Sequence, residues 1–121
     1  MRAFKNKSAH QYKVLVRDTI LPSGSKPSLG RVGDIVIQGS TYTKLVNREV
    51  FESIYSKISD ELCIRNDDIV DADVQRQNCD LMDSNGVLHV ARVGDFVITR
   101  GLCDIEVVVG SVFMRKYTIL R

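Results

Sequence analysis

The pattern of apolar and polar positions occurs twice along this chain. A short apolar run follows Arg-Val-Gly-Asp in residues 31–39 and again in residues 92–101. Each copy continues through a polar turn and a second apolar run to a Phe, followed four residues later by a Tyr. These aromatic pairs are Phe51 with Tyr55 and Phe113 with Tyr117. The copies are offset by 61 residues at the Arg and by 62 at the aromatic pairs, so we infer an internal duplication.

Alternation of apolar and polar residues predicts a chain rich in β-strands. The predicted strands are residues 10–17, 32–37, 42–46, 74–82, 87–91, 95–99 and 104–109. Turn residues separate pairs of these strands at Gly39-Ser40 and at residues 83–86, where Asp-Ser-Asn-Gly is a strong hairpin signal. Residues 22–30 contain both prolines of the chain, and they predict a flexible loop or the tip of a long hairpin.

One helix is predicted, in the first copy. Asn47 is a suitable N-cap, and apolar residues recur at helical spacing from Val50 to Ile58, over about three turns. The alternative is that the chain is already a strand from Tyr55 onward, because the sequence that follows Tyr117 in the second copy is β-like. In the second copy we expect a single helical turn around residues 111–116.

These elements predict an α+β, β-rich fold. A copy of about 60 residues would have difficulty burying enough apolar surface alone. We therefore expect residues 1–121 to form a single compact domain, in which two pseudo-repeats of a β-hairpin and a short helix share one core as a small barrel or sandwich. The first repeat covers about residues 10–58, an acidic connector about 59–73, and the second repeat about 74–121.

Charge is unevenly distributed, although the formal net charge is only +2. Residues 1–31 hold seven Lys or Arg against one acid (+6), residues 32–91 hold five against eleven (−6), and residues 92–121 hold five against three (+2). A basic arm can bind nucleic acid or an acidic partner. The interpretation that we favour is that the basic and acidic stretches lie side by side and neutralise each other.

The cysteines and the hydropathy indicate the compartment. Cys63, Cys79 and Cys103 form no C-x-x-C pair, and no apolar signal stretch precedes them. No apolar run approaches the roughly 20 residues that span a bilayer. We therefore expect free thiols, no membrane partner and a cytoplasmic location.

Searches for catalytic and metal-binding patterns favour structural interpretations. Asp34 and Asp95 each follow a glycine at the start of a strand, where a carboxylate usually accepts backbone N–H bonds of the turn. A calcium loop ending at Gly86 would need carboxylates where the chain has Leu81 and Arg92. The acidic run around it is better explained as a solvated connector, so we expect no metal.

The sequence also gives little support for a zinc site, a Cys–His nucleophile or a phosphate-binding loop. His10 and His89 are not at metal-ligand spacing from any Cys, and a nucleophilic pair of Cys103 with His89 stays open but is not favoured. Glycine-rich phosphate loops are absent. We expect no cofactor and no enzymatic activity.

The duplicated pattern resembles a known family. Val-Gly-Asp, an apolar strand, a glycine turn, a second strand and then Phe-x-x-x-Tyr is similar to small phage and prophage proteins of the PGDYG type, here apparently duplicated. The opening residues 1–8 and the strand after them also resemble that family, whereas its Pro before the Gly is Val32 and Val93 here. The resemblance implies a bacteriophage or mobile-element origin, with the host bacterial cytoplasm as location, but no activity.

The first functional hypothesis is a non-enzymatic, phage-encoded protein that binds a host protein as an inhibitor or anti-defence factor. An acidic face can imitate nucleic acid, and charge patches mainly govern encounter and specificity. The residues expected on this partner-binding face are Asp67, Asp68, Asp71 and Asp73.

The alternative hypothesis is a protein that binds nucleic acid or a nucleotide through its basic N-terminal arm, where Phe4 and Tyr12 would stack bases. The expected binding residues are Lys5, Lys7, Lys13, Arg17, Arg31 and Arg92. A structural accessory of the phage particle is a further alternative, with the duplication supplying a contact surface. The oligomeric state is left open.

Overall fold

The computed structural model describes residues 1–23, 26–39, 43–100 and 104–121. Ser40 of the predicted Gly39-Ser40 turn and the candidate nucleophile Cys103 lie outside these residues. Backbone contacts divide the chain into two compact units. Unit 1 consists of Met1–Ser8 and Asp68–Arg121, and unit 2 consists of Ala9–Asp67. The chain therefore passes from one unit to the other twice.

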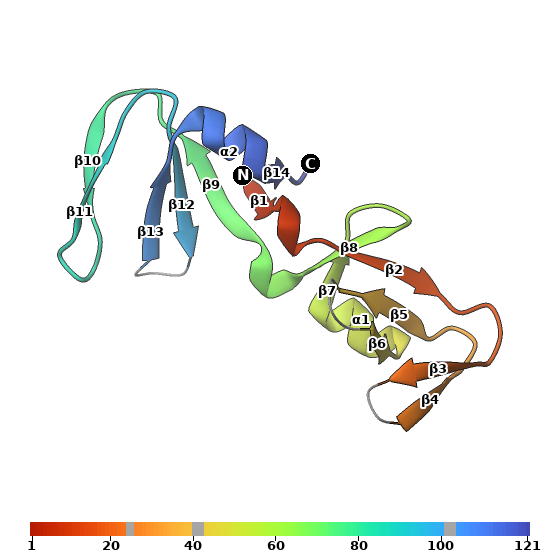
Figure 1. The fold of residues 1–121 in the computed structure, drawn as a ribbon. Coiled ribbons are helices and arrows are strands. Elements are labelled where there is room, and N and C mark those ends of the chain that lie inside the picture. Colours follow the sequence, from red (N-terminus) through yellow and green to blue (C-terminus); the bar gives the residue numbers. More distant parts are fainter. Residues whose placement is uncertain (24–25, 40–42, 101–103) are drawn as a thin grey trace. The chain divides into compact units, whose positions relative to one another are not determined.

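Unit 2 is built on a five-stranded antiparallel sheet (Figure 1). Its strands, in spatial order, are β6 (Thr43–Val46), β5 (Ile35–Gln38), β2 (His10–Val14), β8 (Leu62–Arg65) and β7 (Tyr55–Lys57). Helix α1 (Arg48–Ile54) connects β6 to β7, and β3 (Thr19–Ser23) pairs with β4 (Lys26–Gly30) as a separate hairpin. The hairpin alternative for residues 22–30 is thus confirmed.

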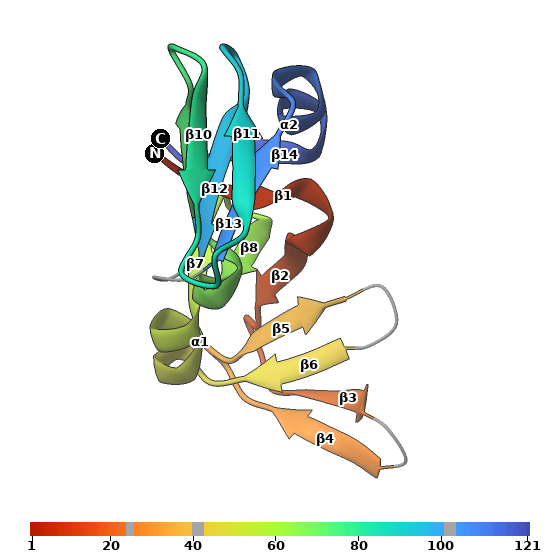
Figure 2. The ribbon, with the colours of Figure 1, turned by 90° about the vertical axis from the view of Figure 1, so that its left-hand side faces the viewer.

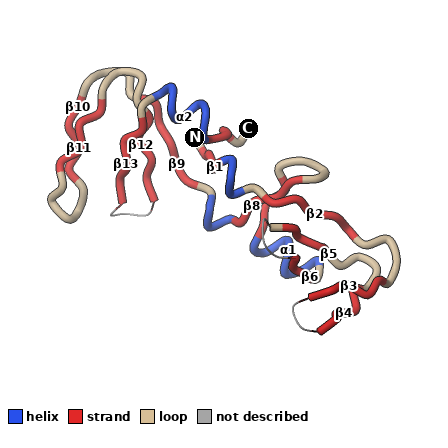
Figure 3. Tube along the Cα trace, viewed as in Figure 1, coloured by secondary structure: helices blue, strands red, loops and turns tan. Residues whose placement is uncertain are grey.

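Unit 1 has a second five-stranded antiparallel sheet. Its strands, in spatial order, are β13 (Asp104–Val108), β12 (Phe96–Arg100), β9 (Val70–Val74), β1 (Arg2–Lys5) and β14 (Tyr117–Ile119). Helix α2 (Gly110–Lys116) connects β13 to β14. The β10–β11 hairpin (Cys79–Met82 and Leu88–Ala91) lies in front of β12 and β13 in Figure 2. The 3-10 helices η1 (Asn6–Ser8) and η2 (Asn66–Asp68) precede β2 and β9. Figure 3 shows how strongly strands predominate in both units.

The duplicated Arg-Val-Gly-Asp segments form tight turns at the start of β5 and β12. The Asp34 Oδ2 atom accepts a hydrogen bond from the Arg31 backbone N–H at 3.0 Å, and Asp95 accepts the same bond from Arg92 at 3.0 Å. The glycine before each Asp has a φ of +90°, a conformation that disfavours any residue with a Cβ. The turn interpretation of both carboxylates is confirmed.

Helix α1 begins as predicted but ends earlier. Asn47 Oδ1 accepts a hydrogen bond of 2.8 Å from the Val50 backbone N–H, so Asn47 is the N-cap. The helix stops at Ile54 because the backbone of Tyr55 is extended and pairs with Arg65 of β8. The continuation of the helix to Ile58 was therefore wrong, and the alternative strand is correct.

The second copy also has a helix, at the position where a single helical turn was expected, but the helix is longer than one turn. Helix α2 is seven residues long, the same length as α1. Its N-cap, Val109, makes no side-chain capping bond, which explains why the sequence carried no start signal. Phe113 is fully buried, so packing rather than capping stabilises this helix.

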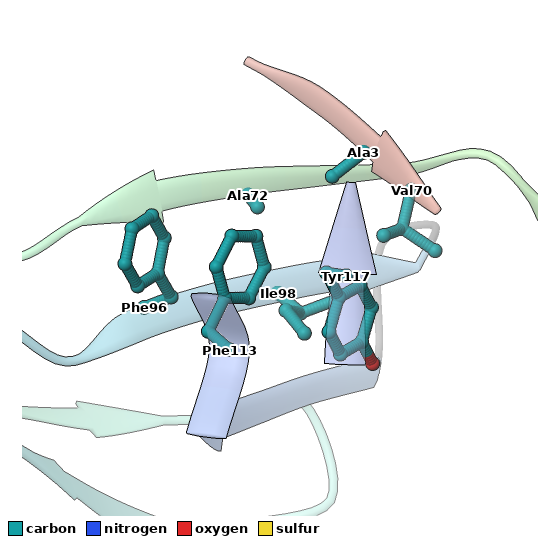
Figure 4. Packing of buried hydrophobic residues seen from close by; sticks show 7 residues of the cluster. All are labelled: Ala3, Val70, Ala72, Phe96, Ile98, Phe113 and Tyr117. Atoms are coloured by element: carbon teal, nitrogen blue, oxygen red, sulfur yellow. The ribbon is translucent and has the colours of Figure 1, made fainter. Parts of the chain in front are cut away.

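Buried apolar residues form two clusters in the described residues, one in each unit. The unit 1 cluster, drawn in Figure 4, consists of Ala3, Val70, Ala72, Phe96, Ile98, Phe113 and Tyr117. The unit 2 cluster consists of Tyr12, Ile35, Ile37, Val46, Phe51, Tyr55 and Cys63. The expected shared core was therefore wrong. No closed barrel is found in the described part of the chain, because both five-stranded sheets have free edges.

Each helix carries the Phe of a Phe-x-x-x-Tyr pair, and the Tyr follows directly after the helix. Both residues of each pair pack in the core of their unit. Phe113 stacks on Tyr117 at a ring-centroid distance of 4.7 Å and on Phe96 at 3.8 Å. Phe51 stacks on Tyr55 at 5.5 Å. The duplicated aromatic residues are therefore core residues, and aromatic pairs of this kind add about 0.5–1.5 kcal/mol beyond the burial of their area.

The stretch expected to be an acidic connector contains two strands of the five-stranded sheets. Strand β8 lies between β2 and β7, and its Cys63 and Ile64 are fully buried. In β9 the buried Val70 and Ala72 alternate with exposed acids. This alternation is the ordinary signature of a half-buried strand, which the acidic composition concealed.

Candidate anion-binding site

A basic pocket of about 290 Å³ lies in unit 1, where η1 meets the end of α2. Its lining residues are Lys5, Asn6, Lys7, Arg115 and Lys116. They come from two segments that are far apart in the sequence. Lys5 is the last residue of β1 and the next two lie in η1, whereas Arg115 and Lys116 form the last turn of α2. Pairing of β1 with β14, the strand that follows α2, brings the two segments together.

Asn6 holds the two sides of this pocket in place. Its Nδ2 atom donates a hydrogen bond of 3.1 Å to the Arg115 carbonyl oxygen, one of the carbonyls that a helix end leaves without an intrahelical partner. The Thr118 hydroxyl donates a hydrogen bond to the Asn6 Oδ1 atom. Both the Nδ2 and the Oδ1 atoms of Asn6 therefore bond within the protein, and the cationic side chains are the main donors that remain for a ligand.

The charge of the pocket is not compensated locally. None of its four cationic side chains lies within 4.0 Å of a carboxylate in the described residues. Lys7, Arg115 and Lys116 are exposed, and Lys5 is half-buried. Arg115 and Lys116 also lie at the negative end of the α2 dipole, which favours cations there. The dipole does not account for Lys5 and Lys7, which come from another segment.

Such a lining can bind anions. An Arg guanidinium presents a planar fork that matches phosphate oxygens, and Lys ammonium groups add mobile point charges. The pocket lining contains no carboxylate, thiol, hydroxyl or imidazole side chain. Its arrangement is suited to holding a phosphate group rather than to transferring a proton to it.

Unit 2 has the same structural clamp, but of the four cations it has only Arg65, at the position equivalent to Lys5. Asn66 Nδ2 donates a hydrogen bond of 3.3 Å to the Ser53 carbonyl oxygen, and the Ser56 hydroxyl donates to Asn66 Oδ1. The residue after this Asn is Asp67 instead of a Lys, and it lies 3.8 Å from the Arg65 guanidinium. The clamp therefore belongs to both units, whereas the cationic lining belongs to unit 1.

The structure brings together only some of the cations that the sequence suggested. Lys5 and Lys7 line the basic pocket, but Arg92, although it lies in unit 1, does not. The remaining predicted cations, Lys13, Arg17 and Arg31, are exposed residues of unit 2. Lys13 lines a different pocket of about 230 Å³, with Gln11, Tyr12, Val36, Gln38 and Glu61. Sequence reasoning missed Arg115 and Lys116, although this adjacent basic pair was visible at the end of the predicted turn.

The two aromatic residues of the basic arm are not available for stacking on bases. Phe4 is only 3% exposed, and Tyr12 belongs to the core of unit 2. The Tyr12 hydroxyl donates a hydrogen bond of 2.9 Å to the Ser59 carbonyl oxygen. Burial raises the Tyr12 pKa, to which the nearby Asp60 and Cys63 also contribute. Stacking on these two rings was therefore a wrong expectation.

The acidic residues proposed to bind a partner are all exposed but are divided between the units. Asp67 ends unit 2, and Asp68 begins the second segment of unit 1. Asp71 and Asp73 share the exposed side of β9. One Asp73 oxygen lies 3.4 Å from the N-terminal nitrogen, so part of this charge has a cationic neighbour.

The thiols and histidines form no alternative reactive centre in the described residues. Cys63 is fully buried, which raises its pKa to about 11, and the Cys79 thiol donates to Gln75 Oε1 at 3.1 Å. His89 Nε2 lies 3.1 Å from Asp83 Oδ2 within the β10–β11 hairpin. No group of three metal-ligating side chains is found in the part of the chain that the structure describes. The described helices are all too short and too polar to cross a membrane.

Comparisons of this chain with protein-family models, with curated proteins and with solved structures found no match.

Proposed function

We propose that this chain is a non-enzymatic binding protein whose basic pocket on unit 1 holds the phosphate backbone of a nucleic acid. The observation that carries the proposal is the group of four cations, Lys5, Lys7, Arg115 and Lys116, with no carboxylate within ion-pair distance in the described residues. Cations that are already paired in the protein would have to break those pairs on binding. These four are free to replace the counterions of a polyanion.

The nature of the lining indicates which part of a nucleic acid would be bound. Cations in a shallow, donor-rich pocket contact phosphate oxygens and carry no sequence information of their own. The nearest aromatic side chain of the arm, Phe4, is buried and contributes no stacking surface. Binding is therefore electrostatic and tolerant of sequence, and it weakens steeply with salt.

We also propose that the chain arose by duplication of one module, of which only one copy has become the ligand-binding unit. In each unit a helix of seven residues ends in a stacked Phe–Tyr pair, and an Asn of a 3-10 helix clamps the end of that helix. The cations differ between the units. Asp67 follows Asn66, whereas Lys7 follows Asn6.

The test is binding of a fluorescently labelled single-stranded oligonucleotide to two variants with the same net charge. The first carries Lys7→Gln, Arg115→Gln and Lys116→Gln in the pocket. The control carries Lys13→Gln, Arg17→Gln and Arg31→Gln, three exposed cations of unit 2. We expect the pocket variant to lose about tenfold or more in affinity, and the control to bind nearly as the unmodified protein does.

The salt dependence gives an independent check. Four phosphate contacts to a single strand predict a slope of log K against log salt of about −3, and the pocket variant reduces this slope to about −1. Equal losses in both triple variants would show that only the overall charge matters, and a flat salt dependence would contradict phosphate binding altogether.

A second candidate function is supported by the exposed side of β9. Asp71 and Asp73 both lie on it, and Asp68 precedes the strand. On this alternative the protein is a phage-encoded inhibitor or anti-defence factor, and its acidic residues contact a basic face of a host protein. Changing Asp67, Asp68, Asp71 and Asp73 to Lys in a tagged protein should then abolish capture of one host protein from nuclease-treated lysate. Unchanged capture would remove this candidate.

A further inference from the structure

The chain can be divided into two halves, about residues 1–59 and 60–121. Each five-stranded sheet is formed mainly by one half and contains one strand from the other half. Strand β1 leads into β2 of unit 2 but lies in unit 1, between β9 and β14. Strand β8 leads into β9 of unit 1 but lies in unit 2, between β2 and β7. Neither strand is at a sheet edge, so its removal would leave two unpaired strands facing a gap.

The exchanged strands also carry core residues. Ala3 of β1 and Cys63 of β8 are both fully buried, each in the cluster of the unit that receives the strand. A half of the chain on its own would therefore lack one inner strand of its sheet and one face of its core. A gap of this kind accepts a strand of the right pattern through backbone hydrogen bonds, as in β-strand addition.

The exchanged strands β8 and β1 pair in the same register with β7 and β14, but only β7 and β8 are joined directly by a loop. In unit 2 the partners of β7 and β8 are Tyr55 with Arg65, Ser56 with Ile64 and Lys57 with Cys63. In unit 1 the partners of β14 and β1 are Tyr117 with Lys5, Thr118 with Phe4 and Ile119 with Ala3. Residues 58–61 connect β7 to β8, whereas β14 and β1 are the last and first strands of the chain.

The closing hydrogen bond of the strand pair is the same with and without the connection, although the Ser59 and Glu61 carbonyl oxygens of the connection also accept hydrogen bonds from Tyr12. The Ile58 N–H donates to the Leu62 carbonyl oxygen at 2.9 Å next to the joined pair. The Leu120 N–H donates to the Arg2 carbonyl oxygen, also at 2.9 Å, next to the pair without a connection. The strand pair thus forms the same closing bond with and without a covalent turn.

We propose that the covalent connection between β7 and β8 is dispensable, and that the two halves of the chain, about residues 1–59 and 60–121, are partners that assemble by mutual exchange of their first strands. The binding surface of each half is the gap in its own sheet, and its occupant is the first strand of a second such half. This inference rests on the sheet topology and does not depend on any ligand of the basic pocket.

The hinges explain why each first strand leaves its own half. Only residues 6–9 separate β1 from β2, and they carry the chain directly from one unit to the other. Asn6, the first of them, is already bound to Arg115 and Thr118 of unit 1. Residues 6–8 form the 3-10 helix η1 instead of a hairpin turn, so β1 does not fold back onto β2. Short hinges of this kind favour exchange over closure.

The experiment cuts the connection between β7 and β8 in the folded full-length protein. A protease site is inserted between Ser59 and Asp60, the chain is cleaved after purification, and the product is examined by size-exclusion chromatography and native mass spectrometry. We expect the two fragments to stay together as a one-to-one complex at micromolar concentration, with an unchanged far-UV CD spectrum. Fragments that separate in native buffer after cleavage would overturn the proposal.

A disulfide shows which half holds β1, and it does not require the cleaved protein to stay folded. Arg2 and Asp71 are antiparallel partners on β1 and β9, and both are exposed. Arg2→Cys and Asp71→Cys are introduced into a protein with the protease site in which Cys79 and Cys103 have been replaced by Ser. The intact chain is oxidised before it is cleaved. Exchange predicts that the fragments remain linked on a non-reducing denaturing gel and separate on reduction. Fragments that separate without reduction would place β1 elsewhere and contradict the exchange.

A circular permutant provides the complementary variant. It begins at Asp60, ends at Ser59, and joins Arg121 to Met1 through a short Gly-Ser linker. Because β14 and β1 are already paired, we expect this protein to fold with a thermal midpoint within a few degrees of that of the unmodified chain. An unfolded permutant would show that the covalent connection between β7 and β8 is needed for the fold and would contradict the proposal.

Discussion

Thr118 donates a hydrogen bond to Asn6 although 112 residues separate them in the sequence. The same Asn6 amide binds the last turn of α2 through the Arg115 carbonyl oxygen. The clamp depends on β1 being in unit 1, and it positions the cations of the basic pocket. Its loss would therefore affect both the stability of unit 1 and the arrangement of these cations.

Replacement of Asn6 by Ala should lower the free energy of unfolding of unit 1 by about 1 kcal/mol, because the helix-end carbonyl and the Thr118 hydroxyl lose their partner. Amide hydrogen exchange, read residue by residue, would place the loss in β1, α2 and β14. Asn66→Ala is the matched control, since it removes the same clamp from unit 2. Loss of protection in both units from either variant would contradict this prediction.

Replacement of Phe113 by Ala should be the more severe change. Phe113 is fully buried and stacks on both Phe96 and Tyr117, so a cavity would remain and the cost would be about 3–5 kcal/mol. Urea unfolding followed by CD, with hydrogen exchange to locate the loss, would measure it. Phe51→Ala in unit 2 is the control. Because the two clusters are separate, each variant should reduce protection mainly in its own unit.

The Cys63 thiol should resist alkylation in the native protein. Burial raises its pKa to about 11, so at pH 8 almost none of it is thiolate, and reagents cannot reach it. Iodoacetamide followed by peptide mass spectrometry should show Cys79 modified before Cys63, and Cys63 only after denaturant is added. Rapid labelling of Cys63 in native buffer would show that β8 opens frequently.

The β10–β11 hairpin should weaken in acid. The hydrogen bond from His89, together with the backbone N–H groups of Val87 and Asn85, holds the pKa of the Asp83 carboxyl below its ordinary value. A carboxyl whose pKa is lower in the folded state stabilises the fold above its unfolded pKa of about 3.9, and this contribution is lost as the pH falls through the folded value.

NMR spectra of the hairpin amides between pH 6 and pH 2 would follow this loss. Asp83→Asn cannot ionise, so the hairpin of that variant should show no transition assigned to residue 83. A hairpin that keeps its shifts and its protection unchanged to pH 2 would contradict the role given to the carboxylate.

Local signals in the sequence were sufficient for much of the secondary structure. The Gly-Asp turns, the Asn47 cap and the hairpin at residues 83–86 depend on neighbouring residues, and the structure has them where they were expected. Helix α2 was underestimated because its stabilisation comes from burial of Phe113 and not from a cap. Strand β9 was mistaken for part of a connector because of its exposed acids, and the short strand β8 because acidic residues lie on both sides of it.

The basic pocket could not be predicted in the same way. Lys5 and Lys7 stood out in the basic arm, but their neighbours depend on the unit into which β1 folds. Nothing in the hydropathy pattern distinguishes pairing with β9 from pairing with β2. Arg115 and Lys116 join the pocket only because β1 lies beside β14.

The place of β1 beside β14 also determines how the molecule would respond to mechanical force. The two strands are antiparallel, and the first residues of β1 face the last residues of β14. A force that pulls the two chain ends apart would therefore separate the strands from one end. Their hydrogen bonds would break one at a time, starting at Ala3 and Ile119, instead of all together. The basic pocket lies next to Lys5 and Tyr117, the last pair to separate, so it would open as soon as the two strands had come apart. An anion bound to cations on both sides of the pocket would then raise the force needed to separate them.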